Sequence, residues 1–404
     1  MEESKKWDLI AIASIPLIMT LGNSMLIPVL PAIRSKLGIT SLQVSLLITI
    51  YSAVAIIFIP VAGYLSDRFG RKMIIIPSLL ITGLGGLISG LGAWWVDQSY
   101  IIIMLGRLLQ GIGAAGAFPI VLPLVGDMFK KEDDVSSSLG IVETANTFGK
   151  VLSPILGSAL ASVVWFLPFL TIPVFCLISA LLVIFLVKAP KKDCNEKKTS
   201  VTRFLKEIKQ IFKNNGRWLY AIFTIGGICM LVIFGVLFYL SDILEENYHI
   251  EGIIKGCILA IPLAFLCIAS FVTGKIIGKN MVLMKWITFS GVTVLTASLL
   301  LIGFFHSVLI LIIFICISGI GIGVVLPCLD ALITESIEKS QRGTITSIYS
   351  SMRFIGVAAG PPLASILIKN SPSILFFSIA AACAIAAVLA LLAIKPASKL
   401  SSSQ

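Results

Sequence analysis

A short charged turn, Gly63-Tyr64-Leu65-Ser66-Asp67-Arg68-Phe69-Gly70-Arg71-Lys72, separates two long apolar runs at 45–62 and 73–93. Apolar runs of this length cross a bilayer as helices. Basic residues between two such helices place their connection in the cytoplasm, which accounts for the two arginines and the lysine of the turn. Topology does not account for Asp67 or for the two glycines, which allow a tight turn and close helix approach.

The composition of the whole chain is that of a membrane protein. Of its 404 residues, 57% are hydrophobic and 13% are charged, and its mean hydropathy is +1.04. This is too apolar for a water-soluble globule. We predict an all-α membrane protein with twelve transmembrane helices. The predicted spans are 9–33, 42–64, 73–95, 100–126, 136–162, 165–187, 218–241, 253–277, 281–304, 307–332, 343–368 and 372–394.

The basic residues predict the orientation of these spans. The two termini and the even-numbered connections hold 24 of the 31 Lys and Arg residues, whereas the odd-numbered connections hold four. This asymmetry places both termini in the cytoplasm. Membrane topology therefore explains most of the net charge of +11, and no nucleic-acid partner is required. We expect a monomer in the lipid bilayer of the inner or plasma membrane.

Other protein classes are disfavoured by what the sequence lacks. The eight cysteines show neither zinc spacing nor an extracellular disulfide framework. The only histidines, His249 and His306, lie near outer span ends, so no metal site or catalytic cluster is expected and we predict no enzyme. A channel would show rings of polar residues along a pore. The charged segment 1–6 and the long first span predict a retained helix and no cleaved signal peptide.

Span 1 carries Asn23 near the membrane centre and two prolines, Pro28 and Pro31, near its outer end. Each proline removes a backbone donor, so we expect a kink or a helix end there. Asn23 should face protein or water. A hydrogen bond between helices explains it as well as contact with a substrate does.

Span 4 contains Arg107 about two turns inside the outer face, followed by Gln110. A charged side chain at that depth should be paired or face a wet cavity; snorkelling to the outer surface is the alternative. Asp127, at the inner end of the span, is close in depth to Arg71 and Lys72. We hypothesise a cytoplasmic salt bridge between Asp127 and the charged turn.

Span 5 combines a small-residue stripe with buried charge. Gly149, Ser153 and Gly157 are spaced at i, i+4 and i+8, beside Pro154, and such a stripe permits close helix packing. Glu143 and Lys150, seven residues apart, share a different face, and the span also holds Asn146. Glu143 is the one carboxylate placed well inside a span, so it is a candidate proton carrier. A permanent ion pair with a basic neighbour is the alternative.

The segment 188–217 is the longest polar stretch and divides the chain into an N-terminal bundle, 1–187, and a C-terminal bundle, 218–404. Within it, residues 203–212 (RFLKEIKQIF) predict an amphipathic basic helix on the inner membrane surface.

The second half repeats features of the first. The triplet at 121–123 (VLP) returns at 325–327, and the pattern 149–154 (GxxxSP) returns at 356–361 as GxxxGP. Parallel repeats of this kind place a substrate cavity between two pseudo-symmetric halves that rock against each other. Span 11 adds Tyr349 and Arg353 near mid-depth. Asp330 corresponds in position to Asp127, and a surface acid at a helix end is the favoured interpretation of it.

These motifs resemble the major facilitator superfamily, and within it the twelve-span drug:proton antiporter group of bacterial multidrug and metabolite exporters. The resemblance covers essentially the whole chain. The turn 63–72 matches G-x-L-a-D-r-x-G-r-k, and span 1 matches l-g-x-x-x-x-x-P-v-x-P over 21–31. Span 4 matches l-x-x-x-R-x-x-q-G-x-g-a-a over 103–115. Span 5 matches g-x-x-x-G-P-x-x-G-G, with Ser153 and Ser158 in place of two glycines.

The resemblance implies roles for these motifs. Asp67 and Arg71, with Asp127 as partner, would belong to a charge network that stabilises the outward-facing state. Arg107 would take part in proton coupling, and the span 5 motif would mark an exporter as against an importer. The residues expected to act in gating are Gly63, Asp67, Arg68, Gly70, Arg71, Lys72, Asp127, Gly149, Pro154 and Gly157.

Charge predicts the substrate class. Many exporters of lipophilic cations in this group resemble each other in a span 1 carboxylate, where this chain has Asn23. Three deep basic residues against one acid favour an anionic or zwitterionic substrate. We predict proton-coupled export of small amphipathic organic molecules by alternating access, with no cofactor beyond the proton gradient. Export of an anionic metabolite or siderophore-like compound is the alternative, ahead of proton-coupled import. The expected proton-coupling residues are Glu143 and Arg107, and the expected substrate-binding residues are Asn23, Gln110, Asn146, Lys150, Tyr349 and Arg353.

Overall fold

The computed structural model describes residues 3–129, 132–188, 201–278, 280–305, 307–337, 339–369 and 371–394, and all regular elements within these ranges are helices. The first half consists of α1 (Glu3–Ser24), η1 (Ile27–Val29), α2 (Leu30–Leu37), α3 (Ser41–Phe69), α4 (Arg71–Trp95), α5 (Tyr100–Ala117), α6 (Val121–Met128), α7 (Glu132–Val163) and α8 (Leu167–Leu186). The second consists of α9 (Val201–Glu246), α10 (Gly252–Ile276), α11 (Met281–Phe304), α12 (Val308–Ser336), α13 (Lys339–Ile368) and α14 (Pro372–Ala393).

Eleven helical segments in the described ranges are long and apolar enough to cross a membrane. The helix α7 occupies the predicted fifth span and is the twelfth long helix at a predicted span, although it is not among these eleven. The all-helical, multi-pass architecture predicted from composition is therefore confirmed.

Two of the predicted spans are interrupted. The first is divided into α1, η1 and α2, with Pro28 and Pro31 at the starts of the second and third pieces, as the missing backbone donors predict. Span 4 was expected to be continuous over 100–126, but it divides into α5 and α6 at residues 118–120, which include Pro119.

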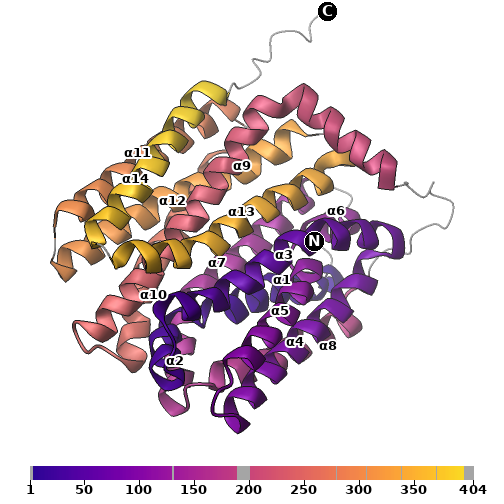
Figure 1. The fold of residues 1–404 in the computed structure, drawn as a ribbon. Coiled ribbons are helices and arrows are strands. Elements are labelled where there is room, and N and C mark those ends of the chain that lie inside the picture. The colour runs from indigo at the N-terminus through magenta and orange to yellow at the C-terminus, as the bar shows by residue number, and fades with distance from the viewer. Residues whose placement is uncertain are drawn as a thin grey trace, which may run out of the picture.

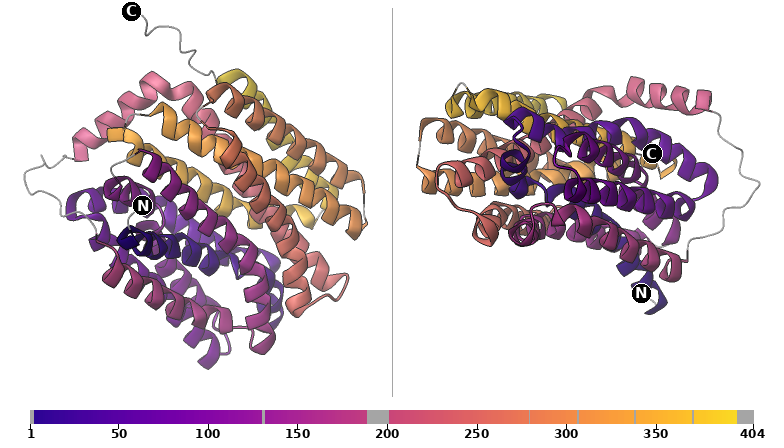
Figure 2. Two further views of the ribbon diagram at one scale, coloured as in Figure 1. Left: turned by 180° about the vertical axis from the view of Figure 1, so that it is seen from behind. Right: turned by 60° about the horizontal axis from the view of Figure 1, so that its bottom comes forward.

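The two halves lie side by side in both views of the ribbon (Figures 1 and 2). In the first half, α1 packs against α7 and α8, and α4 packs against α5 and α8. In the second, α9 packs against α13, and α12 packs against α10 and α11. The halves meet along two helix pairs, α3 with α13 and α7 with α10.

Small residues permit the closest helix approaches. A Cβ atom on Gly157 of α7 would collide with the carbonyl oxygen of Met25, after α1, and one on Gly356 of α13 would collide with that of Gly227 in α9. Glycines of α7 and α13 therefore perform the same packing role in the two halves, as expected where helices associate through backbone proximity.

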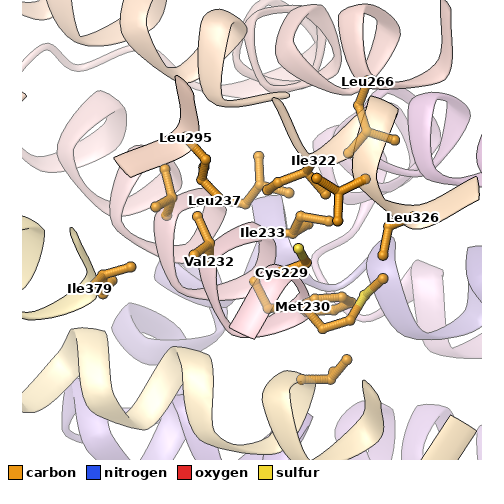
Figure 3. Close-up of a cluster of buried hydrophobic side chains, with 14 of the residues drawn as sticks. Cys229, Met230, Val232, Ile233, Leu237, Leu266, Leu295, Ile322, Leu326 and Ile379 are labelled. Atoms are coloured by element: carbon orange, nitrogen blue, oxygen red, sulfur yellow. The ribbon is translucent and has the colours of Figure 1, made fainter. Parts of the chain in front are cut away.

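The second half is held together by a dense cluster of buried side chains centred on α9 (Figure 3). Ile233 and Leu237 of α9 lie beside Leu266 of α10 and Leu295 of α11 in this cluster. The first part of α9 includes the predicted amphipathic helix 203–212 in one continuous helix with the following span. The side chains of that predicted helix lie outside the described residues.

Candidate functional site

Four charged side chains from the two halves form one cluster, which we call the inter-half charge cluster: Glu143 and Lys150 on α7, Asp330 on α12 and Arg353 on α13. Each lies within electrostatic reach of the other three. Nη1 of Arg353 is 3.7 Å from Oδ1 of Asp330. Two acids and two bases thus balance one another at the junction between the halves.

The acids of the inter-half charge cluster have partners of their own. Oε1 of Glu143 accepts a hydrogen bond from Nδ2 of Asn146 at 3.1 Å. Oδ1 of Asn146 in turn accepts a hydrogen bond from Oγ1 of Thr20 at 2.5 Å. The predicted pair Glu143 and Asn146 is therefore a polar chain that leads back to α1.

Lys150 differs from its neighbours. Its side chain is buried, yet its Nζ atom has no hydrogen-bond partner in the described part of the chain. It lines a cavity between the halves, together with Ser24, Ile27, Pro154, Ile233, Phe234, Leu237, Leu259 and Leu263. The cavity is walled by α1, η1 and α7 on one side and by α9 and α10 on the other.

Tyr349 is fully buried beneath the inter-half charge cluster. The guanidinium carbon of Arg353 lies 5.6 Å from the centre of its ring, and the ring of Phe223 lies 5.9 Å away on α9. Aromatic rings attract cations at this range, so Tyr349 positions Arg353.

Arg107 is fully buried and belongs to a second cluster, within the first half. Its guanidinium donates hydrogen bonds to Oδ1 of Asn23 at 2.6 Å and to Oε1 of Gln110 at 2.7 Å. It also donates to the carbonyl of Leu47 at 2.9 Å and lies 4.4 Å from the ring centre of Tyr51. Arg107 is paired, as one alternative predicted, and does not snorkel outward. The structure thus divides the predicted site residues into two clusters.

The charged turn makes the predicted salt bridge with Asp127. Nε of Arg71 lies 3.0 Å from Oδ2 of Asp127, and the same guanidinium pairs with Asp67 and donates to Oγ of Ser66. Gly70 separates α3 from α4 with φ at +99°, a conformation that favours glycine. The turn therefore connects α3 and α4 to α6.

The remaining turn residues have different surroundings. Nζ of Lys72 donates to the carbonyls of Ile184 at 2.8 Å and Val187 at 2.9 Å, so it caps the end of α8. Arg68 is exposed and lies over the ring of Phe69, 5.3 Å from its centre. Gly63 faces α13, where Ser347 is its nearest neighbour.

The small-residue stripe of span 5 divides between two partners. Gly149 and Gly157 face α1 and the residue that follows it. The carbonyl of Pro154 instead faces Gly256 of α10, in the other half. This motif therefore contacts both α1 in its own half and α10 in the other half.

Two ion-pair contacts were not predicted from the sequence. Asp330 is interpreted there as a surface acid at a helix end; its side chain is 35% exposed, but its carboxylate lies 3.7 Å from Arg353, a contact that the sequence did not indicate. Arg34 of α2 was counted only as a loop residue, but it pairs with Asp242 at 3.1 Å and with Glu246, both on α9. The sequence signal for Asp330 was its position at the end of a span, which corresponds to that of Asp127 in the other half.

Comparison with known proteins agrees with this geometry. Residues 12–305 and 284–404 match the family model described as Major Facilitator Superfamily. The chain is 55% identical over 370 residues to the bacillibactin exporter of Bacillus subtilis (strain 168), covering 91% of this chain and 92% of that protein. It is 26% identical over 360 residues to multidrug resistance protein 2 of the same strain, covering 86% and 85%.

Solved structures share the fold. The human organic anion transporter MFSD10 superposes with a TM-score of 0.75 at 16% identity, covering 96% of this chain and 100% of that one. A bacterial homologue of the human lysosomal transporter Spinster gives the same TM-score and identity, with 97% of both chains covered.

Proposed function

The chain belongs to the major facilitator superfamily of transporters, and from this premise we propose that it exports a siderophore from the cytoplasm at the expense of the proton gradient. The observation that carries the proposal is the 55% identity to the bacillibactin exporter of Bacillus subtilis, which extends over nine tenths of both chains. The more distant multidrug resistance protein, at 26% identity, gives weaker support to a general drug substrate. Of the two substrate classes left open by the sequence, the siderophore-like one is favoured.

The inter-half charge cluster supports a transport cycle. Its residues come from α7 in one half and from α12 and α13 in the other, so rocking of the halves must rearrange the ion pairs. A proton on Glu143 or Asp330 removes a negative charge from the cluster and frees a base. Protonation and rearrangement of the halves are thereby coupled through the same groups.

The roles of single residues follow from this arrangement. Glu143 is the proposed proton carrier, and Arg107 acts on coupling through Asn23 and Gln110, which it holds by hydrogen bonds. Lys150 and Arg353 contribute the positive charge that attracts an acidic substrate. The small-residue motif at Gly149, Pro154 and Gly157 lies between α1 and α10 and supports export as the direction. The proposed location is the cell membrane, with both termini in the cytoplasm.

The test is transport into inside-out membrane vesicles. With an acidic lumen, vesicles that contain the protein should accumulate bacillibactin, and a protonophore should abolish the accumulation. Glu143→Gln should abolish gradient-driven accumulation while leaving the protein in the membrane. Accumulation that is unaffected by the protonophore, or equal in vesicles without the protein, would overturn the proposal.

A further inference from the structure

The cavity between the halves combines one buried cation with an apolar wall. Apart from Lys150 and Ser24, its lining consists of aliphatic side chains, one proline and Phe234. The cavity measures about 10 Å³ in this conformation, room for about one water, so an organic ligand requires the halves to separate here. Its lining is typical of ligand sites, where apolar surface supplies contact and a few polar groups fix orientation. The lining residues come from both halves, so a ligand in the cavity contacts both at once.

Lys150 is the unsatisfied member of the inter-half charge cluster. Arg353 has Asp330 at 3.7 Å, and Glu143 has Asn146 as a hydrogen-bond donor. The side chain of Lys150 is only 8% exposed, and its Nζ has no hydrogen-bond partner among the described residues. Burial of an ammonium without a hydrogen-bond partner is unfavourable. The protein retains this cost at a position that lines the cavity.

We propose that Lys150 binds an anionic oxygen, a carboxylate or a phenolate, whose attached aromatic or branched apolar group packs against Phe234, Ile233 and Leu237. The ammonium would donate charge-assisted hydrogen bonds to this oxygen. This inference rests on the proposed function and names the part of the substrate that the cavity recognises. A neutral or cationic group of the same shape would leave the ammonium unpaired or repel it.

The comparison of Lys150 with Lys255 sharpens the argument. Lys255 on α10 is also buried, with 3% of its surface exposed, but it pairs with Glu245. It does not line the cavity. Two buried lysines near the junction of the halves thus differ in the one property that matters here, the presence of a partner.

Binding of three ligands of matched shape to the purified full-length protein tests the proposal: 1-naphthoate, 1-naphthamide and 1-naphthylmethylamine. The wild-type protein should prefer the anion. Lys150→Met should weaken naphthoate binding by about 10- to 100-fold, the value of a charged hydrogen bond, and leave naphthamide within about twofold. Lys150→Arg should restore the preference, and Lys255→Met should keep it.

A stability measurement supplies an independent outcome. Lys150→Met removes a buried ammonium that lacks a hydrogen-bond partner among the described residues, but it also leaves Glu143 and Asp330 with one base. The melting temperature without ligand should therefore change little, and naphthoate should no longer stabilise the variant. Equal binding of naphthoate and naphthamide to the wild type, or an unchanged preference in Lys150→Met, would overturn the inference. Bacillibactin transport with no anion preference would refute this subsite alone, whereas anion preference without transport would refute the proposed function alone.

Discussion

Arg107 shows how this protein accommodates a full charge deep within a helix bundle. It has no carboxylate partner among the described residues; its contacts are three neutral oxygen acceptors and the ring of Tyr51. Neutral acceptors and an aromatic face can solvate a guanidinium without fixing an ion pair. The arrangement ties α1, α3 and α5 together, since Asn23, Leu47 and Gln110 lie on these three helices.

Removal of Arg107 should therefore destabilise the first half. Arg107→Met removes the donor to the buried side-chain oxygens of Asn23 and Gln110, each worth about 1–3 kcal/mol when unsatisfied; the carbonyl of Leu47 lies within α3 and keeps its helical donor. We expect its melting temperature in detergent to fall by several degrees, whereas Lys36→Met, at an exposed position, should melt like the wild type. Arg107→Lys should rescue little, because an ammonium cannot reach the three acceptors with the same planar geometry. Full stability of Arg107→Met would contradict the role given to this cluster.

Asp330 yields a second prediction at the level of single residues. Asp330→Asn leaves Arg353 without its carboxylate, so the cluster loses an acid that can take up a proton. We expect proton-driven accumulation of bacillibactin to fall to background in inside-out vesicles, while exchange of labelled for unlabelled bacillibactin continues without a gradient. Asp97→Asn, at an exposed site outside the spans, is the control. Normal accumulation in Asp330→Asn would exclude Asp330 from coupling.

At the level of elements, the charged turn adds polar contacts between the ends of helices that also pack against one another. Arg71 connects the α3–α4 turn to Asp127 in α6, and Lys72 connects it to the end of α8. Both acids that pair with Arg71 are half exposed, so each pair is worth about 1 kcal/mol or less. Such a bond biases an equilibrium between conformations and does not determine folding.

Asp127→Asn should consequently alter conformation more than stability. A loss of about 1 kcal/mol changes the ratio of two conformations by about fivefold, while the melting temperature should move little. The change in this ratio would be measured as a change in the rate at which a thiol reagent labels a cysteine introduced at the exposed position Arg68. Asp67→Asn should act in the same direction, since both acids bind one guanidinium. A large drop in melting temperature with unchanged labelling would contradict this account.

The outer ends of α2 and α9 are joined by a separate set of contacts. Arg34 pairs with Asp242 and Glu246, and Oγ of Ser241 donates to the carbonyl of Ile27 at 3.1 Å. All of these bonds cross between the halves, so the proposed transport cycle requires them to break when the halves separate at this end.

Arg34→Gln should favour the outward-open conformation. A change of about 1–3 kcal/mol would raise the labelling rate of a cysteine at Ser24, in the cavity, by about 5- to 150-fold with a reagent applied from outside. Arg34→Lys should preserve most of the closure. An unchanged rate in Arg34→Gln would show that these ion pairs do not limit opening.

At the level of the whole molecule, local chemistry and long-range packing were not equally predictable. Hydropathy located twelve spans, the proline pair in span 1 indicated its break, and the motif charges indicated the Arg71–Asp127 bridge. The pairing of Arg34 with Asp242 and of Asp330 with Arg353 was missed. These pairs depend on how helices distant in sequence or in separate halves dock, and periodicity within a helix carries no such information. The break at Pro119 was missed because proline is often tolerated within a transmembrane helix.

The central claim is that the inter-half charge cluster is reached alternately from the two faces of the membrane. The most direct measurement is of distances between spin labels in a background lacking Cys194, Cys257 and Cys267. One pair of labels is at the predicted outer side, Lys36→Cys with Tyr248→Cys. The other pair is at the predicted inner side, Arg68→Cys with Lys275→Cys. On adding bacillibactin or changing pH, the account predicts that one distance lengthens as the other shortens. Two distances that stay constant, or that lengthen together, would contradict it.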